Sequence, residues 1–287
     1  MESMEPPTSP APGFADVDWS TVERVIVLSP HLDDAALSCG GLLAALRGHV
    51  SRLVVTVTCA DAKARKGHIN PAPRRLEDRQ ALASIDCDVA HLGFADAIYR
   101  RSPISGQLIY AGIRERMAAP PIDDAAHVEE LYLVMRRLCL DMGRVILLSP
   151  MAVGQHVDHV LCAHVAVRLL GNSPDLFFYE DFPYVVGGVL ADVPDDDPQR
   201  ALRRLNQAPA ECVRVPIDAE RKLALLRHYP SQMPLLFGDD QRMAAAVQSQ
   251  QVDGQPIESY WRVRPARSRG NHRGAGGRGG PAAGRNR

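Results

Sequence analysis

Apolar runs of strand length alternate with segments of helical periodicity along the first half of the chain. The runs at 22–29 (VERVIVLS), 52–58 (RLVVTVT) and 145–150 (VILLSP) are rich in Val, Ile and Leu, which predicts buried strands. Apolar residues recur at helical spacing over 34–47 and 127–142. The order strand, helix, strand predicts a βαβ unit, and its recurrence predicts an α/β fold with a mostly parallel sheet and helices on both faces.

The pattern is less regular elsewhere. A helix is predicted over 76–85 and a short strand over 89–92, after a polar segment at 63–75 (KARKGHINPAPRR) that is typical of a proline-broken loop. Residues 96–121 contain Gly and Pro without a steady period, which predicts a long loop of the kind that covers a site. One more helix is predicted around 219–227, and no internal repeat or second domain is recognisable.

Composition narrows the class of protein. With 287 residues, 46% of them hydrophobic, the chain can bury a large core and is expected to be globular. No apolar stretch approaches the roughly 20 residues that span a bilayer, and the first residues lack the basic start and apolar segment of a signal peptide. We therefore expect a cytoplasmic protein with no membrane partner. Six cysteines stand singly without C-x-x-C spacing, which argues against a disulfide framework and a cysteine zinc site.

Charge is unevenly distributed along the chain. The formal net charge is −1, but six arginines and no acid follow Pro265, so residues 1–266 carry a net charge of −7. An acidic folded part argues against nucleic acid as a partner. The Arg/Gly-rich tail at 265–287 has nothing to bury and is predicted to be disordered, as is the segment 1–20. The RGG-like composition of the tail leaves RNA binding open, and we favour a solubilising or incidental role.

Clusters of histidine and aspartate follow two of the predicted strands. The members of the first are His31, Asp33 and Asp34, and those of the second are His156, Asp158 and His159. Ligands of open α/β sheets bind beyond the carboxyl ends of the strands, so both clusters stand where a site is expected. Taken singly, each aspartate has a simpler role as a helix cap or dipole partner, worth ~0.3–1 kcal/mol. The combination at two strand ends favours one joint site.

The donor set predicts a zinc hydrolase. A catalytic zinc takes about three ligands from His, Asp or Glu and keeps a further position for water. His31, Asp34 and His159 can supply such a set. Asp33 then stays free as the general base for a water whose pKa zinc lowers from ~15.7 to about 7.

The second cluster leaves two residues for other roles. A protonated His156 would face the substrate and stabilise the oxyanion. Asp158 would fix the orientation of that imidazole and favour its charged form.

The motifs PHLDD with LSCGG, and GQHVDH, resemble the P-H-x-D-D and H-x-D-H signatures of the LmbE-like, or PIG-L, zinc-dependent N-deacetylases. That family includes enzymes that remove acetyl from N-acetylglucosaminyl-inositol and from glucosaminyl intermediates of low-molecular-weight thiols and antibiotics. The resemblance covers roughly residues 22–262 and implies one deacetylase domain over 21–264. It implies a Rossmann-like three-layer sandwich with one Zn2+ per chain at the strand ends, Fe2+ being the alternative in the cell.

The resemblance implies the same site roles as the chemistry of the two clusters. It gives the zinc ligands as His31, Asp34 and His159, the general base as Asp33, the electrophilic group as His156 and its partner as Asp158.

Two further segments resemble substrate-contacting parts of the family. The segment RRLEDRQAL implies that Arg74 or Arg75 reaches sugar hydroxyls or a phosphate, and that Glu77 is structural. The segment LGFADAIYR implies a substrate contact from Asp96, with Arg100 as a further candidate. The simpler interpretation is a solvated arginine on an amphipathic helix and an aspartate that caps a turn.

The chain departs from the family pattern at a few positions. Leu32 and Val157 replace prolines at non-ligand positions, and Gly154 stands where some members have an acid-base tyrosine. A tyrosine of the site would have to come from elsewhere, with the candidates Tyr179, Tyr184 and Tyr229 left unranked.

The predicted function is removal of the N-acetyl group from an N-acetylglucosamine-type aminosugar in a small glycoside or natural-product intermediate, as in antibiotic biosynthesis. An amidase acting on larger acyl groups of glucosaminyl amides is the close alternative. A nucleotide-binding Rossmann protein that uses Gly40 and Gly41 is the alternative from another class. It is disfavoured because the turn lacks G-x-G-x-x-G and its carboxylates would repel a pyrophosphate. The carrier of the sugar and the oligomeric state, including a homo-oligomer, stay open.

Overall fold

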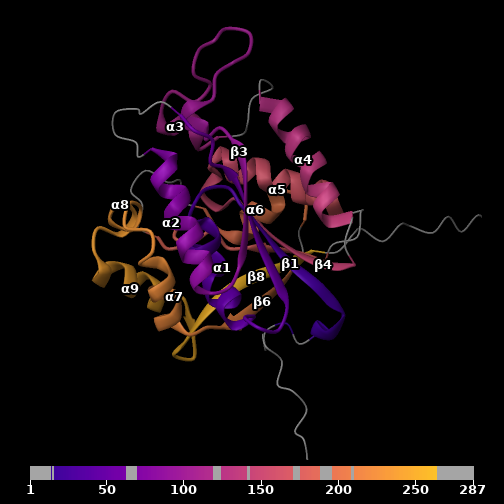
Figure 1. Cartoon of the computed structure of the whole chain (residues 1–287), viewed down its shortest axis with the longest axis vertical. Helices are drawn as coiled ribbons and strands as arrows, with labels where there is room; N and C mark the ends of the chain where they lie inside the picture. The colour runs from indigo at the N-terminus through magenta and orange to yellow at the C-terminus, as the bar shows by residue number, and fades with distance from the viewer. Residues whose placement is uncertain are drawn as a thin grey trace, which may run out of the picture.

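The computed structural model describes residues 14, 16–62, 70–118, 124–140, 143–170, 175–187, 196–207 and 210–263. A mostly parallel sheet forms the centre of the fold (Figure 1). Its strands are β1 (Val22–Ser29), β2 (Ser51–Thr58), β3 (Asp88–Phe94), β4 (Arg144–Pro150), β5 (Asp175–Tyr179), β6 (Glu211–Pro216), β7 (Gln251–Val252) and β8 (Gln255–Val263). The order is β3-β2-β1-β4-β5-β8-β6, with β7 paired to β8. Strands β1 to β5 pair in parallel, and β8 runs antiparallel to β5 and β6.

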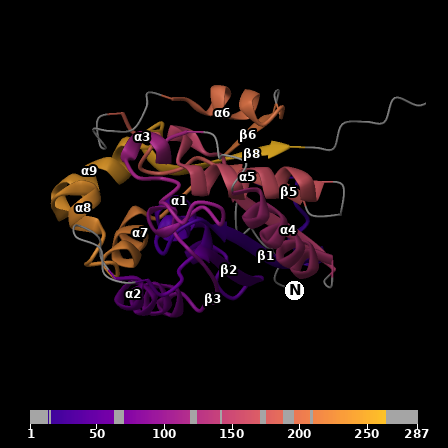
Figure 2. The same ribbon diagram turned by 90° about the horizontal axis from the view of Figure 1, so that it is seen from above.

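Helices cover both faces of this sheet (Figure 2). They are α1 (Asp34–Ala45), α2 (Pro71–Ser84), α3 (Ile113–Arg116), α4 (Ala125–Leu140), α5 (Val157–Leu169), α6 (Pro198–Arg204), α7 (Ala219–Leu226), α8 (Met233–Phe237) and α9 (Asp240–Ser249). Side chains of β1 alternate between the two layers, because successive residues of a strand point to opposite faces. Val25 and Val27 pack in the core with α1 and α7, whereas Ile26 and Leu28 pack with α4 and α5. The predicted α/β three-layer sandwich is confirmed.

Helix α2 begins five residues before its predicted start. The Asn70 side chain accepts a hydrogen bond from the N–H of Ala72 at 2.9 Å and caps the helix. Pro71 is then the first helical residue, a position that favours proline because its missing N–H has no partner there in any case. The proline interpreted as breaking a loop therefore starts the helix.

The folded part of the chain also begins before residue 21, the predicted start of the domain. Phe14 and Val17, within the segment expected to be disordered, are buried. The Phe14 ring lies 4.8 Å from that of Phe177 and 5.4 Å from that of Tyr260, centroid to centroid. These aromatic contacts pull the segment onto the sheet. The rest of the disorder prediction, at 1–13, 15 and 265–287, lies outside the described residues.

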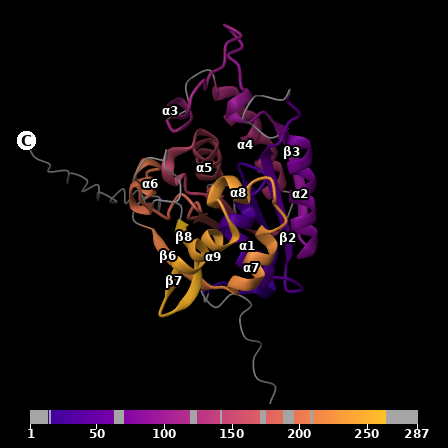
Figure 3. The same ribbon diagram turned by 90° about the vertical axis from the view of Figure 1, so that its left-hand side faces the viewer.

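The last part of the described chain contains elements that the sequence analysis did not foresee. Helices α8 and α9 follow α7 on one side of the molecule, and β6 and β8 extend the sheet beyond β5 (Figure 3). The predicted long loop at 96–121 holds a single 3-10 turn, η3 (Ala97–Tyr99), and α3 among its described residues, and is otherwise irregular. Within the part of the chain that the structure describes, the helices are too short or too polar to cross a bilayer.

Gly40 and Gly41 serve packing. A Cβ atom on Gly41 would lie 2.5 Å from Cγ2 of Ile217, and one on Gly40 would lie 2.9 Å from Cδ2 of Leu225. The pair lets α1 approach α7 and the residues before it closely. This explanation removes the basis for a phosphate-binding role of the two glycines.

Candidate active site

The loop after β1 and the start of α5 meet at one end of the sheet. Strands β1 and β4 are neighbours, and the chain continues from them to opposite sides, to β2 and to β5. The carboxyl ends of such a strand pair form a topological switch point, where open α/β sheets bind ligands. The ring of His31 lies 4.8 Å from that of His156 and 5.3 Å from that of His159, measured between centroids. The two sequence clusters therefore form one site.

Asp34 lies between two of the histidines. Its Oδ2 atom is 3.0 Å from Nδ1 of His31 and 3.3 Å from Nε2 of His159. Nitrogen atoms of His31, His156 and His159 also lie within 4.8 Å of one another. Nε2 of His159 is buried and has no hydrogen-bond partner among the described residues. A buried nitrogen with a free lone pair beside a carboxylate and a second imidazole is a donor set that fits a metal ion.

The charges at the site are balanced in a way that suits a divalent cation. Burial opposes a charge on His31, but Asp34 and Asp158 raise its pKa well above the usual value. For His159, burial is likewise outweighed by Asp34 and Asp181, which raise the pKa to about 9. Burial would raise the pKa of Asp34, yet His159 and His31 hold it well below the usual value. Asp34 thus attracts positive charge at both imidazoles, which is an electrostatic environment that suits a divalent cation.

Each proposed histidine ligand has a carboxylate on its other nitrogen. Nδ1 of His159 lies 2.6 Å from Oδ1 of Asp181, which also accepts a hydrogen bond from the N–H of Val153 through Oδ2 at 2.9 Å. Nε2 of His31 lies 3.1 Å from Oδ2 of Asp158. Histidines that bind metals usually donate their second N–H to such a group, which fixes the ring and raises its basicity. Asp181 is not among the site residues predicted from the sequence. It follows β5 as Asp33 and Asp34 follow β1, and this position after a strand could have marked it as a candidate.

Asp33 is buried beside the donor set and points to an arginine. Burial raises the pKa of its carboxyl group to about 6, while the positive charge of Arg74 acts in the opposite direction. One Arg74 nitrogen lies 3.6 Å from Oδ2 of Asp33. A carboxylate whose pKa is raised toward neutrality is a better proton acceptor than an ordinary aspartate.

The surroundings of His156 act against the protonated imidazole expected from the sequence. Burial and the neighbouring His31 lower its pKa well below the usual value, despite the opposing charge of Asp158. Nδ1 of His156 accepts a hydrogen bond from the backbone N–H of Asp158 at 3.3 Å. In a neutral ring with this hydrogen bond, the proton is on Nε2.

The carboxylate of Asp158 has partners other than His156. It lies 3.1 Å from His31 and forms an ion pair of 2.6 Å with Arg100. Burial would raise the pKa of Asp158, but Arg100 and His31 hold it well below the usual value. The expected orientation of His156 comes from the backbone of Asp158, and its carboxylate orients His31.

The turn that presents His156 has an unusual backbone. Ala152, Gly154 and Gln155 have positive φ angles of 62°, 79° and 61°. Such conformations are uncommon for residues with a side chain and cluster at functional sites. The N–H of Gly154 donates to Asp196 at 3.0 Å. Glycine tolerates this conformation best, which accounts for its presence where some family members have a tyrosine.

The two candidate arginines differ in position. Arg74 faces Asp33, as described above, whereas Arg75 donates to the carbonyl oxygen of Cys59 at 2.6 Å and pairs with Asp61 at 2.5 Å. Arg75 is thus held at the surface, away from the histidines. Glu77 accepts a hydrogen bond from the Ser231 hydroxyl at 2.5 Å, in keeping with the structural role expected for it.

Asp96 and Arg100 lie on the segment after β3. Oδ1 of Asp96 accepts from the N–H of Ile98 at 3.1 Å and caps η3, while its Oδ2 lies 4.0 Å from Nε2 of His31. Asp96 therefore caps a turn and borders the site at once. Arg100 is only 3% exposed and pairs with two aspartates, so its charge is neutralised inside the protein.

Only one of the three candidate tyrosines borders the histidines within the described chain. The Tyr184 ring packs edge-on against His159 with centroids 5.4 Å apart. The hydroxyl of Tyr179 donates to the carbonyl oxygen of Leu28, and that of Tyr229 donates to Asp78.

Comparison with known proteins finds relatives that are named deacetylases. Residues 26–170 match the sequence profile of the family described as PIG-L, GlcNAc-PI de-N-acetylase. Two relatives carry the name 2'-N-acetylparomamine deacetylase. The one from Streptomyces fradiae is 36% identical over 173 residues, 56% of this chain and 57% of the relative. The one from Niallia circulans is 29% identical over 187 residues, 55% of this chain and 66% of the relative. Each match thus spans less than two thirds of the relative's length.

A solved structure shows the same fold. The zinc-inhibited form of teicoplanin deacetylase Orf2 superposes with a TM-score of 0.68 at 24% identity, covering 84% of this chain and 97% of that protein. The profile match includes both histidine and aspartate clusters, which the fold brings together at the ends of β1 and β4. The chain therefore belongs to the PIG-L family of GlcNAc-PI de-N-acetylases.

Proposed function

We propose that the protein is a zinc-dependent N-deacetylase that hydrolyses the acetamide of an N-acetylglucosamine-type aminosugar to acetate and a free amine. One observation carries the proposal. Asp34 lies between the imidazoles of His31 and His159, and a second buried carboxylate, that of Asp33, stands next to it with its pKa raised to about 6. Metal donors and an uncommitted base in one buried place are the parts that amide hydrolysis needs.

We assign the metal ligands to His31, Asp34 and His159, and the ion to zinc, with Fe2+ as the alternative in the cell. Two nitrogens and a carboxylate oxygen form a usual ligand set for catalytic zinc. When bound, zinc supplies a Lewis acid that polarises the amide carbonyl and makes the attacking water more acidic. Asp181 and Asp158 hold the rings of His159 and His31 in place for this task.

Asp33 and His156 perform the proton chemistry in our proposal. Asp33 takes a proton from the water as its oxygen attacks the carbonyl carbon, and returns it to the nitrogen as the C–N bond breaks. The Nε2–H group of His156 donates a hydrogen bond to the carbonyl oxygen while negative charge develops there, and the proton stays on the ring.

The substrate we propose is a small aminoglycoside intermediate in antibiotic biosynthesis, processed in the cytoplasm. Support comes from the two relatives named for 2'-N-acetylparomamine, a compound with an acetylated amine on an aminosugar. Arg74 and Asp96 border the site and supply a donor and an acceptor for sugar hydroxyls.

Release of amine from 2'-N-acetylparomamine tests the proposal. The full chain is freed of metal with a chelator, reloaded with one equivalent of Zn2+ and assayed for free amine and acetate. We expect activity to disappear on chelation and to return with zinc. Full activity of the metal-free protein would contradict the metal role, and a zinc-loaded protein that releases no amine would contradict the substrate.

A further inference from the structure

A buried network of charges connects the proposed metal site to the segment after β3. Arg100 pairs with Asp158 at 2.6 Å and with Asp124 at 3.1 Å. The Tyr110 hydroxyl donates to the same oxygen of Asp124 at 2.5 Å. The guanidinium carbon of Arg100 lies 4.9 Å from the centre of the Tyr110 ring. All four side chains are almost inaccessible, with both aspartates at 0% exposure.

Asp158 connects this network to His31, a proposed metal ligand. Its Oδ1 faces Arg100, and its Oδ2 lies 3.1 Å from Nε2 of His31 and accepts the N–H of Ala97 at 3.1 Å. The carboxylate is thus fixed from two sides, by a cation and by a backbone group. A carboxylate held in this way also fixes the ring of the histidine that it contacts.

Arg100 provides the compensating charge for two fully buried carboxylates. A buried ion loses the solvation of water and depends on its partner, so removal of one partner leaves an uncompensated charge. Loss of Arg100 would remove the guanidinium contact of both carboxylates, and would leave Asp158 with His31 at 3.1 Å and Asp124 with the Tyr110 hydroxyl and with His127 at 3.2 Å. Both carboxylates would then have to move or change their contacts.

Arg100 and Tyr110 also close the base of a projecting hairpin. Arg101 and Leu108 form a bridge, and the N–H of Ile109 donates to the carbonyl oxygen of Arg100 at 3.0 Å. Arg100 and Tyr110 stand at the two ends of this hairpin, which lies in the long loop between β3 and α3 (Figure 1). The loop that borders the site is therefore attached to it by the ion pair between Arg100 and Asp158, together with the hydrogen bond from the N–H of Ala97 to the same carboxylate.

We propose that Arg100 is a positioning residue of the metal site: through Asp158 it fixes His31, and through Tyr110 and Asp124 it fastens the base of the 101–109 hairpin. This inference rests on the proposed function, because it takes His31 as a ligand. It assigns no substrate contact to Arg100. The expected consequence is that Arg100 controls the affinity of the chain for zinc.

Zinc affinity of Arg100 variants, measured by competition with a chromogenic chelator, tests the proposal without an activity assay. Arg100→Met keeps the length of the side chain and removes its charge, and we expect it to bind zinc about 10-fold more weakly, as for loss of other groups that orient a metal ligand. Arg100→Lys keeps the charge but cannot bridge two carboxylates, and its affinity should lie between those of Arg100→Met and the unaltered chain.

Lys222→Met is the matched control. Lys222 and Glu258 form another buried ion pair, at 2.9 Å, between α7 and β8 and without contact to the histidines. We expect this variant to lose thermal stability while its zinc affinity stays within about 2-fold of the unaltered chain. A similar loss of zinc affinity in both variants would mean a general effect of destabilisation and would overturn the proposal.

A double variant tests whether Arg100 acts through Asp158. If it does, Asp158→Asn should weaken zinc binding about as much as Arg100→Met, and the combination should be little weaker than either change alone. Additive losses, or unchanged affinity in Arg100→Met, would overturn the proposal. The double variant carries no negative charge at residue 158 that would lack a partner. If Arg100→Met alone does not fold, zinc affinity is therefore measured on the double variant. A chain that binds no zinc before any substitution would instead refute the metal site itself, and hence the proposed function.

Discussion

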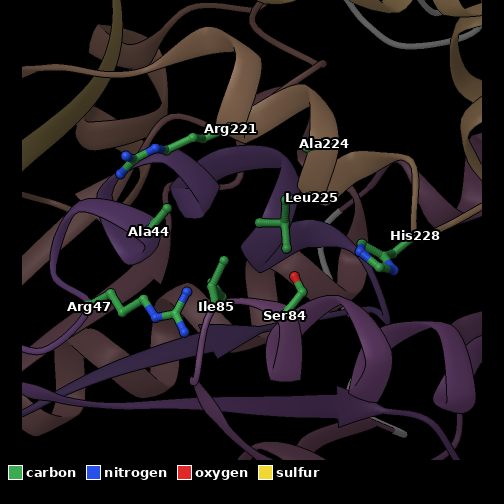
Figure 4. A pocket seen from close by; sticks show the side chains of 8 residues that line it. All are labelled: Ala44, Arg47, Ser84, Ile85, Arg221, Ala224, Leu225 and His228. Atoms are coloured by element: carbon green, nitrogen blue, oxygen red, sulfur yellow. The ribbon is translucent and has the colours of Figure 1, made fainter.

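The two ends of helix α1 carry charged residues in very different surroundings. At its start, the donors His31, Asp34 and His159 are buried, and Oδ2 of Asp34 lies 3.0 Å and 3.3 Å from nitrogens of the two histidines. At its end lies a hollow of about 560 Å³ between α1, α2 and α7, with Arg47, Arg221 and His228 on its walls (Figure 4). Arg47 pairs with Asp86 and Arg221 pairs with Asp218.

The comparison shows that the proposed site and the surface hollow differ in the exposure of their charged side chains. The side chains of the Arg47 and Asp86 pair are 55% and 62% exposed, against 1% and 7% for His159 and Asp34. Exposed pairs are screened by water and contribute ~0–1 kcal/mol, so a chain can gain or lose them without consequence. Charges kept out of water are costly, and their persistence in one cluster indicates a chemical task.

Replacing Asp33, the proposed general base, should reduce activity far more than any substitution at the other end of α1. We expect Asp33→Asn to lower kcat by ~10²–10⁴-fold, the usual contribution of a general acid or base, with zinc content unchanged. Because burial raises the pKa of Asp33 in the folded state, its ionised form opposes folding at neutral pH, so the metal-free variant should be at least as stable. Initial rates, metal analysis and thermal unfolding check the three parts. A variant that keeps most of its rate would remove Asp33 from the mechanism.

Asp181 should affect metal binding before chemistry. Asp181→Asn weakens the contact with Nδ1 of His159, and loss of such a group usually costs 10–100-fold in metal affinity, so a decrease of about that size is expected. Chelator competition measures it, with Lys222→Met again as the control. Equal affinities of Asp181→Asn and the unaltered chain would show that His159 needs no such partner.

Arg74 and Arg75 form a natural pair for testing substrate contact. Arg74→Ala should raise KM about 10-fold, the size of a lost charge-assisted hydrogen bond, with a smaller change in kcat. Arg75→Ala should leave KM unchanged, because Arg75 is tied to Cys59 and Asp61. Steady-state kinetics on the same substrate decide between them, and the reverse ranking would contradict the positions in the structure.

Substitutions in the hollow at the end of α1 should have the smallest effects. Arg47→Ala and Arg221→Ala each break an exposed pair and should change the free energy of unfolding by less than about 1 kcal/mol. Turnover and KM should be unaltered. A marked loss of activity in either variant would show that the hollow takes part in function, and the contrast drawn here would not hold.

The amino-acid pattern predicts the order of strands and helices in the first half of the chain and the donor types of the site. Runs such as 22–29 and 145–150 are apolar enough to be buried on both faces, and this local pattern suffices to predict parallel strands. Since parallel strands present their carboxyl ends at one edge, the two histidine and aspartate clusters could be predicted to meet there. Donor types then limited the chemistry to a metal-dependent hydrolase.

The interaction partner of each buried charged side chain follows from the tertiary structure and has no signature in the local sequence. That Asp181 contacts His159, and that Arg100 pairs with Asp158, depends on which strand ends and loops are adjacent in space. The lowered pKa of His156 depends on burial and on nearby charges from other elements, neither of which has a local pattern in the chain. Periodicity records which side of an element is buried, whereas the partner and protonation state of a buried group are set by contacts between residues far apart in the sequence.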